Sequence, residues 1–339
     1  MKKLSVLLVM FVLALTFMFY GCGEQKEQLE KIRVNEVTHS IFYAPFYVAI
    51  NNGYFADEGF EIELTNGGGA DKSMTAIISK DADIGLMGPE AAIYVTEGGA
   101  KDKPVVFGQL TKRDGSFIVS KTAIENFTFE HLRGKTIIGG RKGGVPAMTL
   151  QYAIEDAGLE IGTSANQVNL RTDVAFNLTA SVFDSTDAEF CTLFEPTASE
   201  LCAEKGYHIV ASVGQLSGEV PYTAFMARSE YVQDNPLKIQ RFLRAVYRGY
   251  LFLKQASVDE LAKSLKPSFS DASDQSIVTS INSYIESDAW VDNPLLQEYS
   301  FNRLQNIMEN AGELDKRVDY ASIVNTQIPK KVYSYFNFD

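Results

Sequence analysis

Apolar segments with strand-like composition alternate with helix-like segments over the first third of the chain. Strands are predicted at 33–38, 60–64, 83–87 and 105–110. Pro45 suits the first turn of a helix that ends at Gly53, and residues 71–79 form a second amphipathic segment. Strands that alternate with helices predict an α/β sheet whose loops gather at one edge.

A second set of alternating segments follows, and the chain then becomes helical. Strands are predicted at 116–120, 135–139, 188–194 and 208–213, and residues 220–227 are predicted to return to the first lobe. Pro236 opens a long helix whose apolar residues share one face: Ile239, Phe242, Leu243, Val246, Tyr250 and Leu253. Further helices are predicted at 271–287 and 295–310. The pattern indicates two α/β units and a helical C-terminal region.

The N-terminal segment differs from the rest of the chain. Two lysines precede an apolar run from Leu4 to Tyr20, and a glycine precedes Cys22. This pattern predicts a lipoprotein export signal over residues 1–21, a lipid on Cys22 and a polar tether over residues 22–31. An uncleaved N-terminal anchor helix is the alternative. Both interpretations place the body of the protein on the outer, extracytoplasmic side of the cell membrane.

Composition and charge exclude several classes of protein. The chain is 45% hydrophobic and 22% charged, as is typical of globular proteins. Cleavage of the export signal would remove two lysines and change the formal charge from −12 to −14. An acidic surface opposes binding of nucleic acid. No later apolar segment is long enough to span a bilayer, which excludes a permease.

Cysteine and histidine usage gives no sign of a metal site or a cofactor. The three histidines are far apart in the sequence and lie outside any HxxxH or CxxC spacing. Cys191 and Cys202 are interpreted as free thiols, with a disulfide between them as the alternative. We therefore expect neither a metal nor a cofactor.

Four stretches of the sequence, taken in order, resemble one known family. They are VTHSIFYAPFYVAINNGYFADEGFEIEL (37–64), ADIGLMGPEAAIYV (82–95), LRGKTIIGGRKGG (132–144) and LFEPTASEL (193–201). They are similar to the ABC-importer binding proteins for nitrate, sulfonates, taurine and thiamine pyrimidine precursors. The resemblance covers nearly the whole chain after the export signal.

The resemblance implies a type II periplasmic-binding-protein fold, in which two α/β lobes joined by two crossover strands close on a ligand. The crossings would lie near 116–120 and 222–227. The first lobe would comprise residues 32–118 and 224–339, and the second lobe residues 119–223. The implied partners are a small-molecule ligand, an ABC permease and its ATPase, and the implied state is a monomer.

Candidate ligand-binding residues lie in the loops that follow the predicted strands. In the first lobe these are His39, Phe42 and Tyr43, whose rings can stack on a planar ligand, and Gly88 and Glu90. The alternative interpretation of Phe42 is packing in the core, and that of Glu90 is capping of its own helix. The alternative interpretation of Gly88 is that the turn requires a glycine.

The second lobe and the crossings supply the other candidates, namely Arg113, Gly143, Gly144, Phe194, Glu195 and Tyr222. The resemblance implies a role for Glu195, because binders of thiamine precursors use a glutamate near this strand end for the pyrimidine amino group. Capping of its own helix is the alternative for Glu195. Arg113, Arg141 and Lys142 could instead pair with a sulfonate or carboxylate ligand.

The favoured hypothesis is a solute-binding protein for a planar heterocycle, and an alkanesulfonate or similar anion is the alternative ligand. Gly134-Lys135-Thr136 does not complete a nucleotide-binding loop, because the pattern requires glycine where the chain has Phe129. The related pyrimidine synthases carry a CCCFC segment that is absent from this sequence, so an enzyme is not expected. A ligand-sensing receptor would close by the same hinge motion and stays open as an alternative.

Overall fold

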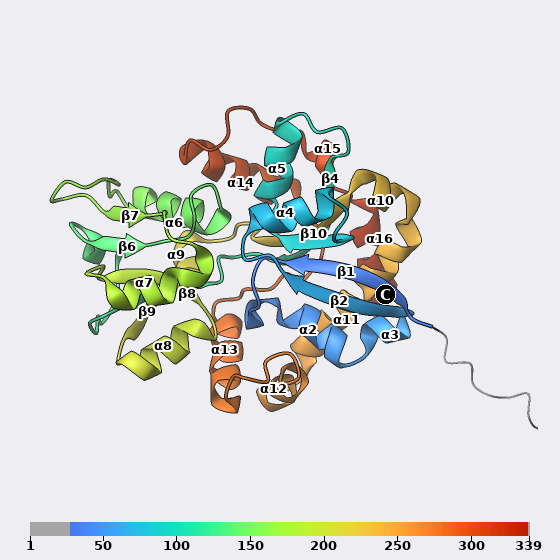
Figure 1. The fold of residues 1–339 in the computed structure, drawn as a ribbon, viewed down its shortest axis with the longest axis horizontal. Coiled ribbons are helices and arrows are strands. Elements are labelled where there is room, and N and C mark those ends of the chain that lie inside the picture. Colours follow the sequence, from blue (N-terminus) through green and yellow to red (C-terminus); the bar gives the residue numbers. More distant parts are fainter. Residues whose placement is uncertain (1–27, 338–339) are drawn as a thin grey trace, which may run out of the picture.

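Two mixed five-stranded sheets form the framework of the computed structural model, which describes residues 28–337 (Figure 1). The first sheet has the order β2–β1–β3–β10–β4, and the second has the order β7–β6–β8–β5–β9. The strands are β1 (Glu30–Glu36), β2 (Phe60–Asn66), β3 (Ile84–Met87), β4 (Pro104–Thr111), β5 (Ser116–Ser120), β6 (Thr136–Ile138), β7 (Asn169–Arg171), β8 (Phe190–Phe194), β9 (His208–Ser212) and β10 (Thr223–Arg228). The predicted α/β class with two lobes is confirmed.

Each sheet contains four parallel strands and one reversed strand. β10 is antiparallel to both β3 and β4, and β5 is antiparallel to both β8 and β9. These are the first strands that the chain forms after it passes from one lobe to the other. Because each starts at the edge where the parallel strands end, it runs against them.

The two crossovers therefore lie within residues 112–115 and 213–222, next to the segments predicted to cross. The lobe boundary predicted after residue 118 falls inside β5, which pairs with β8 and β9 of the second sheet.

Helices pack around both sheets, and the C-terminal helices extend the first lobe (Figure 1). Before the first crossover the chain forms η1 (Ile41–Tyr43), α2 (Ala44–Asn51), α3 (Tyr54–Asp57), α4 (Ala70–Ile78) and α5 (Glu90–Glu97). The second lobe has η2 (Phe129–Leu132), α6 (Val145–Asp156), η3 (Phe176–Leu178), α7 (Thr179–Ser185) and α8 (Thr197–Lys205), and α9 (Val213–Ser217) begins the return. The C-terminal region has α10 (Ser229–Asp234), α11 (Pro236–Gln255), α12 (Val258–Leu265), α13 (Asp274–Glu286), α14 (Glu298–Asn310), α15 (Tyr320–Ile323) and α16 (Gln327–Phe336).

Helix α11 carries the predicted apolar stripe into the core of the first lobe. The stripe residues from Ile239 to Tyr250 are buried, and Phe242 packs against Phe55 with ring centroids 5.0 Å apart. Gly249 lies where α11 meets α2, and a Cβ at this position would stand 2.0 Å from the carbonyl oxygen of Pro45. Glycine is therefore required for the close approach of these two helices.

Three features of the described region bear on the other predictions. Within residues 28–337, no helix has the length and apolar character needed to cross a bilayer. The same residues contain no group of histidine, cysteine and acidic side chains arranged to hold a metal ion. Cys191 and Cys202 are free thiols. The predicted export signal and the predicted lipid attachment at Cys22 lie outside the described residues.

Candidate ligand-binding site

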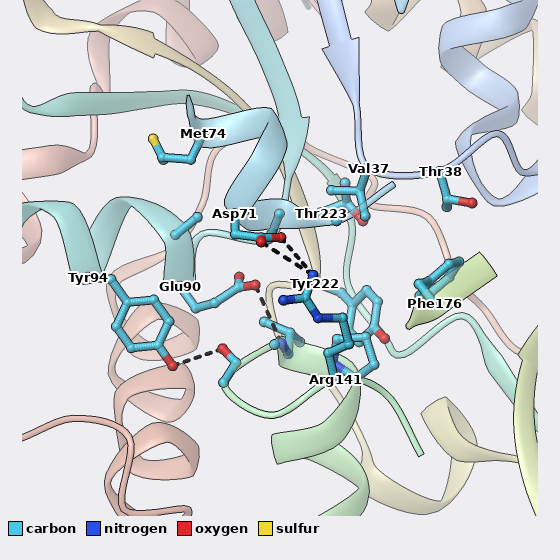
Figure 2. Close-up of a pocket in the computed structure, with 18 of the residues that line it drawn as sticks. Val37, Thr38, Asp71, Met74, Glu90, Tyr94, Arg141, Phe176, Tyr222 and Thr223 are labelled. Atoms are coloured by element: carbon cyan, nitrogen blue, oxygen red, sulfur yellow. Dashed lines mark hydrogen bonds and ion pairs between the residues drawn. The ribbon is translucent and has the colours of Figure 1, made fainter. Parts of the chain in front are cut away.

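A cavity of about 500 Å³ lies between the two lobes (Figure 2). Its walls come from the turns that follow β1, β2 and β3 in the first lobe and from the turn that follows β6 in the second. The wall also includes Phe176 of η3, Phe194 at the end of β8, Tyr222 of the second crossover and Glu313 after α14. Ligand sites in α/β proteins commonly lie at this edge of the sheets and between domains. The position indicates a binding site that both lobes share.

Glu90 is a buried carboxyl group in the cavity wall and is only 3% exposed. Gly88 makes room for it, because a Cβ on Gly88 would stand 1.9 Å from Glu90 Oε2. Glu90 Oε1 accepts a hydrogen bond from the backbone N–H of Val145 at 3.4 Å, which joins the lobes. Oε2 has no hydrogen-bond partner among the described residues. Burial raises the pKa of Glu90 to about 7. The cavity thus offers an acceptor that a bound molecule can satisfy.

Aromatic rings form a second feature of the cavity wall. Tyr43, Tyr94, Phe176, Phe194 and Tyr222 all line it. The ring centroids of Phe176 and Phe194 are 5.4 Å apart, and those of Phe194 and Tyr222 are 6.2 Å apart. Burial raises the pKa of Tyr43 and of Tyr222 well above the usual value, so their hydroxyls stay protonated. Such a wall suits a flat, partly apolar ligand.

Polar contacts join the lobes at the cavity, and several involve the turn after β6. Arg141 Nη1 lies 3.1 Å from Asp71 Oδ1 of α4, and Lys142 Nζ lies 3.7 Å from Glu313 Oε1. The Tyr94 hydroxyl donates to the carbonyl oxygen of Gly143 at 2.9 Å (Figure 2). These contacts hold the two lobes together over the cavity.

Seven of the predicted ligand-binding residues line this one cavity. They are Tyr43, Gly88, Glu90, Gly143, Gly144, Phe194 and Tyr222. Four others, His39, Phe42, Arg113 and Glu195, do not line it. Arg141 and Lys142, considered in the sequence for an anionic ligand, do line it.

Glu195 holds the first turn of its own helix, which was the alternative interpretation. Its carboxylate accepts hydrogen bonds from the backbone N–H of Ser199 at 2.9 Å and from the Ser199 hydroxyl at 2.6 Å. The Ser283 hydroxyl on α13 donates to it at 3.3 Å. Burial raises the pKa of Glu195. The carboxylate is therefore already satisfied by the protein.

Phe42 and Arg113 are also used elsewhere in the structure. Phe42 is fully buried behind the wall, with its ring centroid 5.7 Å from that of Tyr222, and so has the core role that was its alternative. Arg113 lies near two carboxylates outside the cavity, Glu219 at 3.7 Å and Asp288 at 3.6 Å.

His39 points away from the cavity into a network beneath the loop that follows β1. Its Nδ1 lies 2.8 Å from Glu36 Oε1, and its Nε2 lies 2.8 Å from the carbonyl oxygen of Ser268. The hydrogen bond with Glu36 raises the pKa of His39. The imidazole thus anchors this loop to the segment between α12 and α13.

Several residues of the wall were not predicted from the sequence. Tyr94 follows Glu90 by four positions on α5, so helical periodicity could have placed both on one face. Asp71 stands in the first turn of α4, directly after the glycine turn. Phe176 begins η3 and Glu313 follows α14, and no local pattern in the sequence relates either residue to the cavity.

Comparison with known proteins identifies relatives along nearly the whole chain. The family model described as NMT1/THI5 like matches residues 41–257. The Bacillus subtilis (strain 168) protein named "Putative binding protein YtlA" is 40% identical over 321 residues, which cover 94% of this chain and 95% of that protein.

Solved structures share the fold at low sequence identity. The periplasmic nitrate-binding protein NrtA from Synechocystis PCC 6803 is 15% identical with a TM-score of 0.74, covering 92% of this chain and 90% of its own. The alkanesulfonate-binding protein SsuA from Xanthomonas axonopodis pv. citri, bound to MOPS, is 16% identical with a TM-score of 0.69. The match covers 87% of this chain and 98% of the SsuA chain. The desulfurization enzyme DSZB is 13% identical with a TM-score of 0.64, and the match covers 91% of this chain and 100% of the DSZB chain. Binding proteins and an enzyme thus share this fold, so the ligand must be argued from the site.

Proposed function

This chain is a binding protein of the NMT1/THI5-like family, and we propose that it serves an ABC importer by capturing a small planar heterocycle between its lobes. The ligand class that we assign is an aminopyrimidine similar to the pyrimidine precursor of thiamine. The ligand is held by contacts alone and leaves the cavity chemically unchanged.

The observation that carries this proposal is the free acceptor of Glu90 beside an aromatic wall. A buried carboxyl oxygen without a partner is costly, and a ligand N–H removes that cost. An aminopyrimidine offers an exocyclic amino group and a flat ring, which match Glu90 Oε2 and the rings of Phe194 and Tyr222. A cavity of about 500 Å³ is large enough for a ring of this size with short substituents.

The charges of the site disfavour an anion. Each of the two cations that line the cavity within the described chain is paired, Arg141 with Asp71 and Lys142 with Glu313. The side chains of Arg141 and Lys142 are 44% and 79% exposed, whereas Glu90 is buried. A sulfonate or nitrate would therefore face an ionisable carboxyl group before it met an unpaired cation.

The assigned partners follow from the family and from the predicted export signal. We assign a position on the outer face of the membrane, with the chain tethered through a lipid on Cys22 and acting as a monomer. In this position the closed, ligand-bound form would be the one that the permease and its ATPase receive.

Thermal unfolding with a ligand panel tests the proposal. The panel contains the aminopyrimidine precursor of thiamine, the same pyrimidine without its exocyclic amine, taurine, an alkanesulfonate and nitrate. A ligand at a hundredfold its Kd adds about 2.7 kcal/mol of stability. We expect a shift with the aminopyrimidine only, and its loss in Glu90→Gln.

The exposed Glu125 provides the matched control, because Glu125→Gln should keep the shift of the wild-type protein. A shift with taurine or nitrate and none with the aminopyrimidine would show that the assigned ligand class is wrong. Mass spectrometry of the incubated pyrimidine checks that it is recovered intact, and a changed mass would instead indicate an enzyme.

A further inference from the structure

Asp114 and Tyr222 each bring a buried polar group without a hydrogen-bond partner to the hinge between the lobes. Asp114 of the first crossover is 1% exposed, and Ser116 donates to its Oδ1 from the backbone N–H at 2.7 Å and from the hydroxyl at 2.6 Å. Asp114 Oδ2 has no hydrogen-bond partner in residues 28–337, and neither has the hydroxyl of Tyr222, which is 5% exposed. Buried polar groups are rarely left unsatisfied, so this pair requires an explanation.

The two crossovers that carry these groups lie side by side. The backbone N–H of Val220 donates to the carbonyl oxygen of Lys112 at 2.9 Å, and that of Tyr222 donates to Thr111 at 3.2 Å. The Asp114 carboxylate is close enough to the Tyr222 hydroxyl to raise the pKa of Tyr222, although burial is the larger cause. Both groups thus stand on the segments that must flex when the lobes separate.

Tyr222 also belongs to the cavity wall, as Figure 2 shows. Its ring lies at the cavity, and its centroid is 6.2 Å from that of Phe194 and 5.7 Å from that of Phe42. A single side chain therefore contacts the ligand space through its ring and approaches the hinge carboxylate through its hydroxyl.

We propose that Tyr222 is a positioning residue that couples ligand occupancy to hinge closure, by donating a hydrogen bond from its hydroxyl to Asp114 Oδ2. This bond satisfies both orphan groups at once in the closed conformer. In an open conformer water can reach the hinge and replace it. A ligand packed against the ring holds the hydroxyl in place and so favours closure. The inference rests on the proposed function in that the ligand must enter this cavity.

Ligand dissociation followed by tryptophan fluorescence tests the coupling. Trp290 is the single tryptophan of the chain, and its indole N–H donates to the carbonyl oxygen of Phe42 at 2.9 Å, so it reports on the hinge. With the aminopyrimidine precursor of thiamine as the probe, Tyr222→Phe keeps the ring and removes the hydroxyl. We expect dissociation to become about tenfold faster, as for the loss of one hydrogen bond, with the association rate changed by less than about threefold.

Two further variants separate coupling from general damage. Tyr207 lies away from the hinge, and its hydroxyl donates to Asp184 Oδ1 at 2.8 Å. The control variant Tyr207→Phe removes that hydroxyl and should leave both the association rate and the dissociation rate unchanged. Asp114→Asn should speed dissociation, and the double variant with Tyr222→Phe should be no faster than the faster single variant. The inference would be overturned if the ligand dissociated from Tyr222→Phe at the wild-type rate, or if the two substitutions had additive effects on the dissociation rate in the double variant.

A ligand-free measurement distinguishes failure of this inference from failure of the proposed ligand. If the aminopyrimidine does not bind the wild-type protein, the ligand class is wrong and the hinge is examined by small-angle X-ray scattering. Tyr222→Phe should then give a larger radius of gyration than the wild-type protein at equal unfolding free energy, because closed conformers are lost. Equal radii of gyration would overturn the coupling.

Discussion

Replacing Glu90 by glutamine should make the ligand-free protein more stable at alkaline pH, although it removes the ligand acceptor. The Glu90 carboxyl is buried, which raises its pKa from 4.5 to about 7. Between these two values the folded protein keeps a proton that the unfolded chain has released, so the free energy of unfolding falls as the pH rises. The loss is complete above pH 7 and amounts to about 3 kcal/mol, at about 1.4 kcal/mol per unit. Glutamine has no charge to bury and avoids this loss.

Urea unfolding of the wild-type protein and Glu90→Gln from pH 5 to pH 8 measures the effect. The stability advantage of the variant should be below about 1 kcal/mol at pH 5 and about 3 kcal/mol at pH 8. Other buried carboxyl groups, such as Glu195, contribute equally to both proteins and cancel in the difference. Glu125→Gln, which removes a carboxyl group at an exposed position, is the matched control. An advantage of Glu90→Gln that fails to grow with pH would refute the reasoning.

Three further substitutions test the packing and the closure of the cavity. Gly88→Ala places a Cβ 1.9 Å from the cavity carboxylate and should weaken aminopyrimidine binding at least tenfold by isothermal titration calorimetry, with an unchanged circular dichroism spectrum. Gly249→Ala places a Cβ 2.0 Å from the carbonyl oxygen of Pro45 and should lower the free energy of unfolding by about 1–3 kcal/mol in urea, whereas unchanged stability would contradict the close helix contact. Asp71→Asn removes the charged partner of Arg141 and should make ligand dissociation faster in stopped-flow measurements. The free energy of unfolding should change by less than about 1 kcal/mol, and Asp71→Glu should restore slow dissociation.

The fold could be predicted from the sequence because its signals are local and strong. The apolar stripe of α11 and the glycine or proline at the element ends placed most strands and helices within a few residues. Strand β7 and helices α7, α12, α15 and α16 were not predicted, and some helix starts differ from the prediction. The helix predicted from residue 271 begins at Asp274, because the Ser273 hydroxyl accepts the backbone N–H of Ser276 and caps it there.

The site could be predicted only in part, because its residues meet through the tertiary structure. Residues at or shortly after the end of a strand, such as Phe194 and Glu90, were found because strand ends gather at one edge. Glu195 also follows a strand, but its carboxylate turns back to its own helix, and the sequence supports both directions equally. Glu313 reaches the cavity from the C-terminal region, which periodicity alone cannot relate to a distant loop.

Acidic side chains stand at helix N-termini that face the cavity. Helices α4, α5 and α6 all begin at the cavity, and such N-termini would ordinarily attract an anion. Asp71 and Glu90 stand in the first turns of α4 and α5, and Glu90 Oε1 also accepts the first N–H of α6. The chain therefore places its own carboxyl groups at these helix ends. The second oxygen of Glu90 has no hydrogen-bond partner among the described residues, so a ligand that docks on it is selected for the hydrogen-bond donor that it brings.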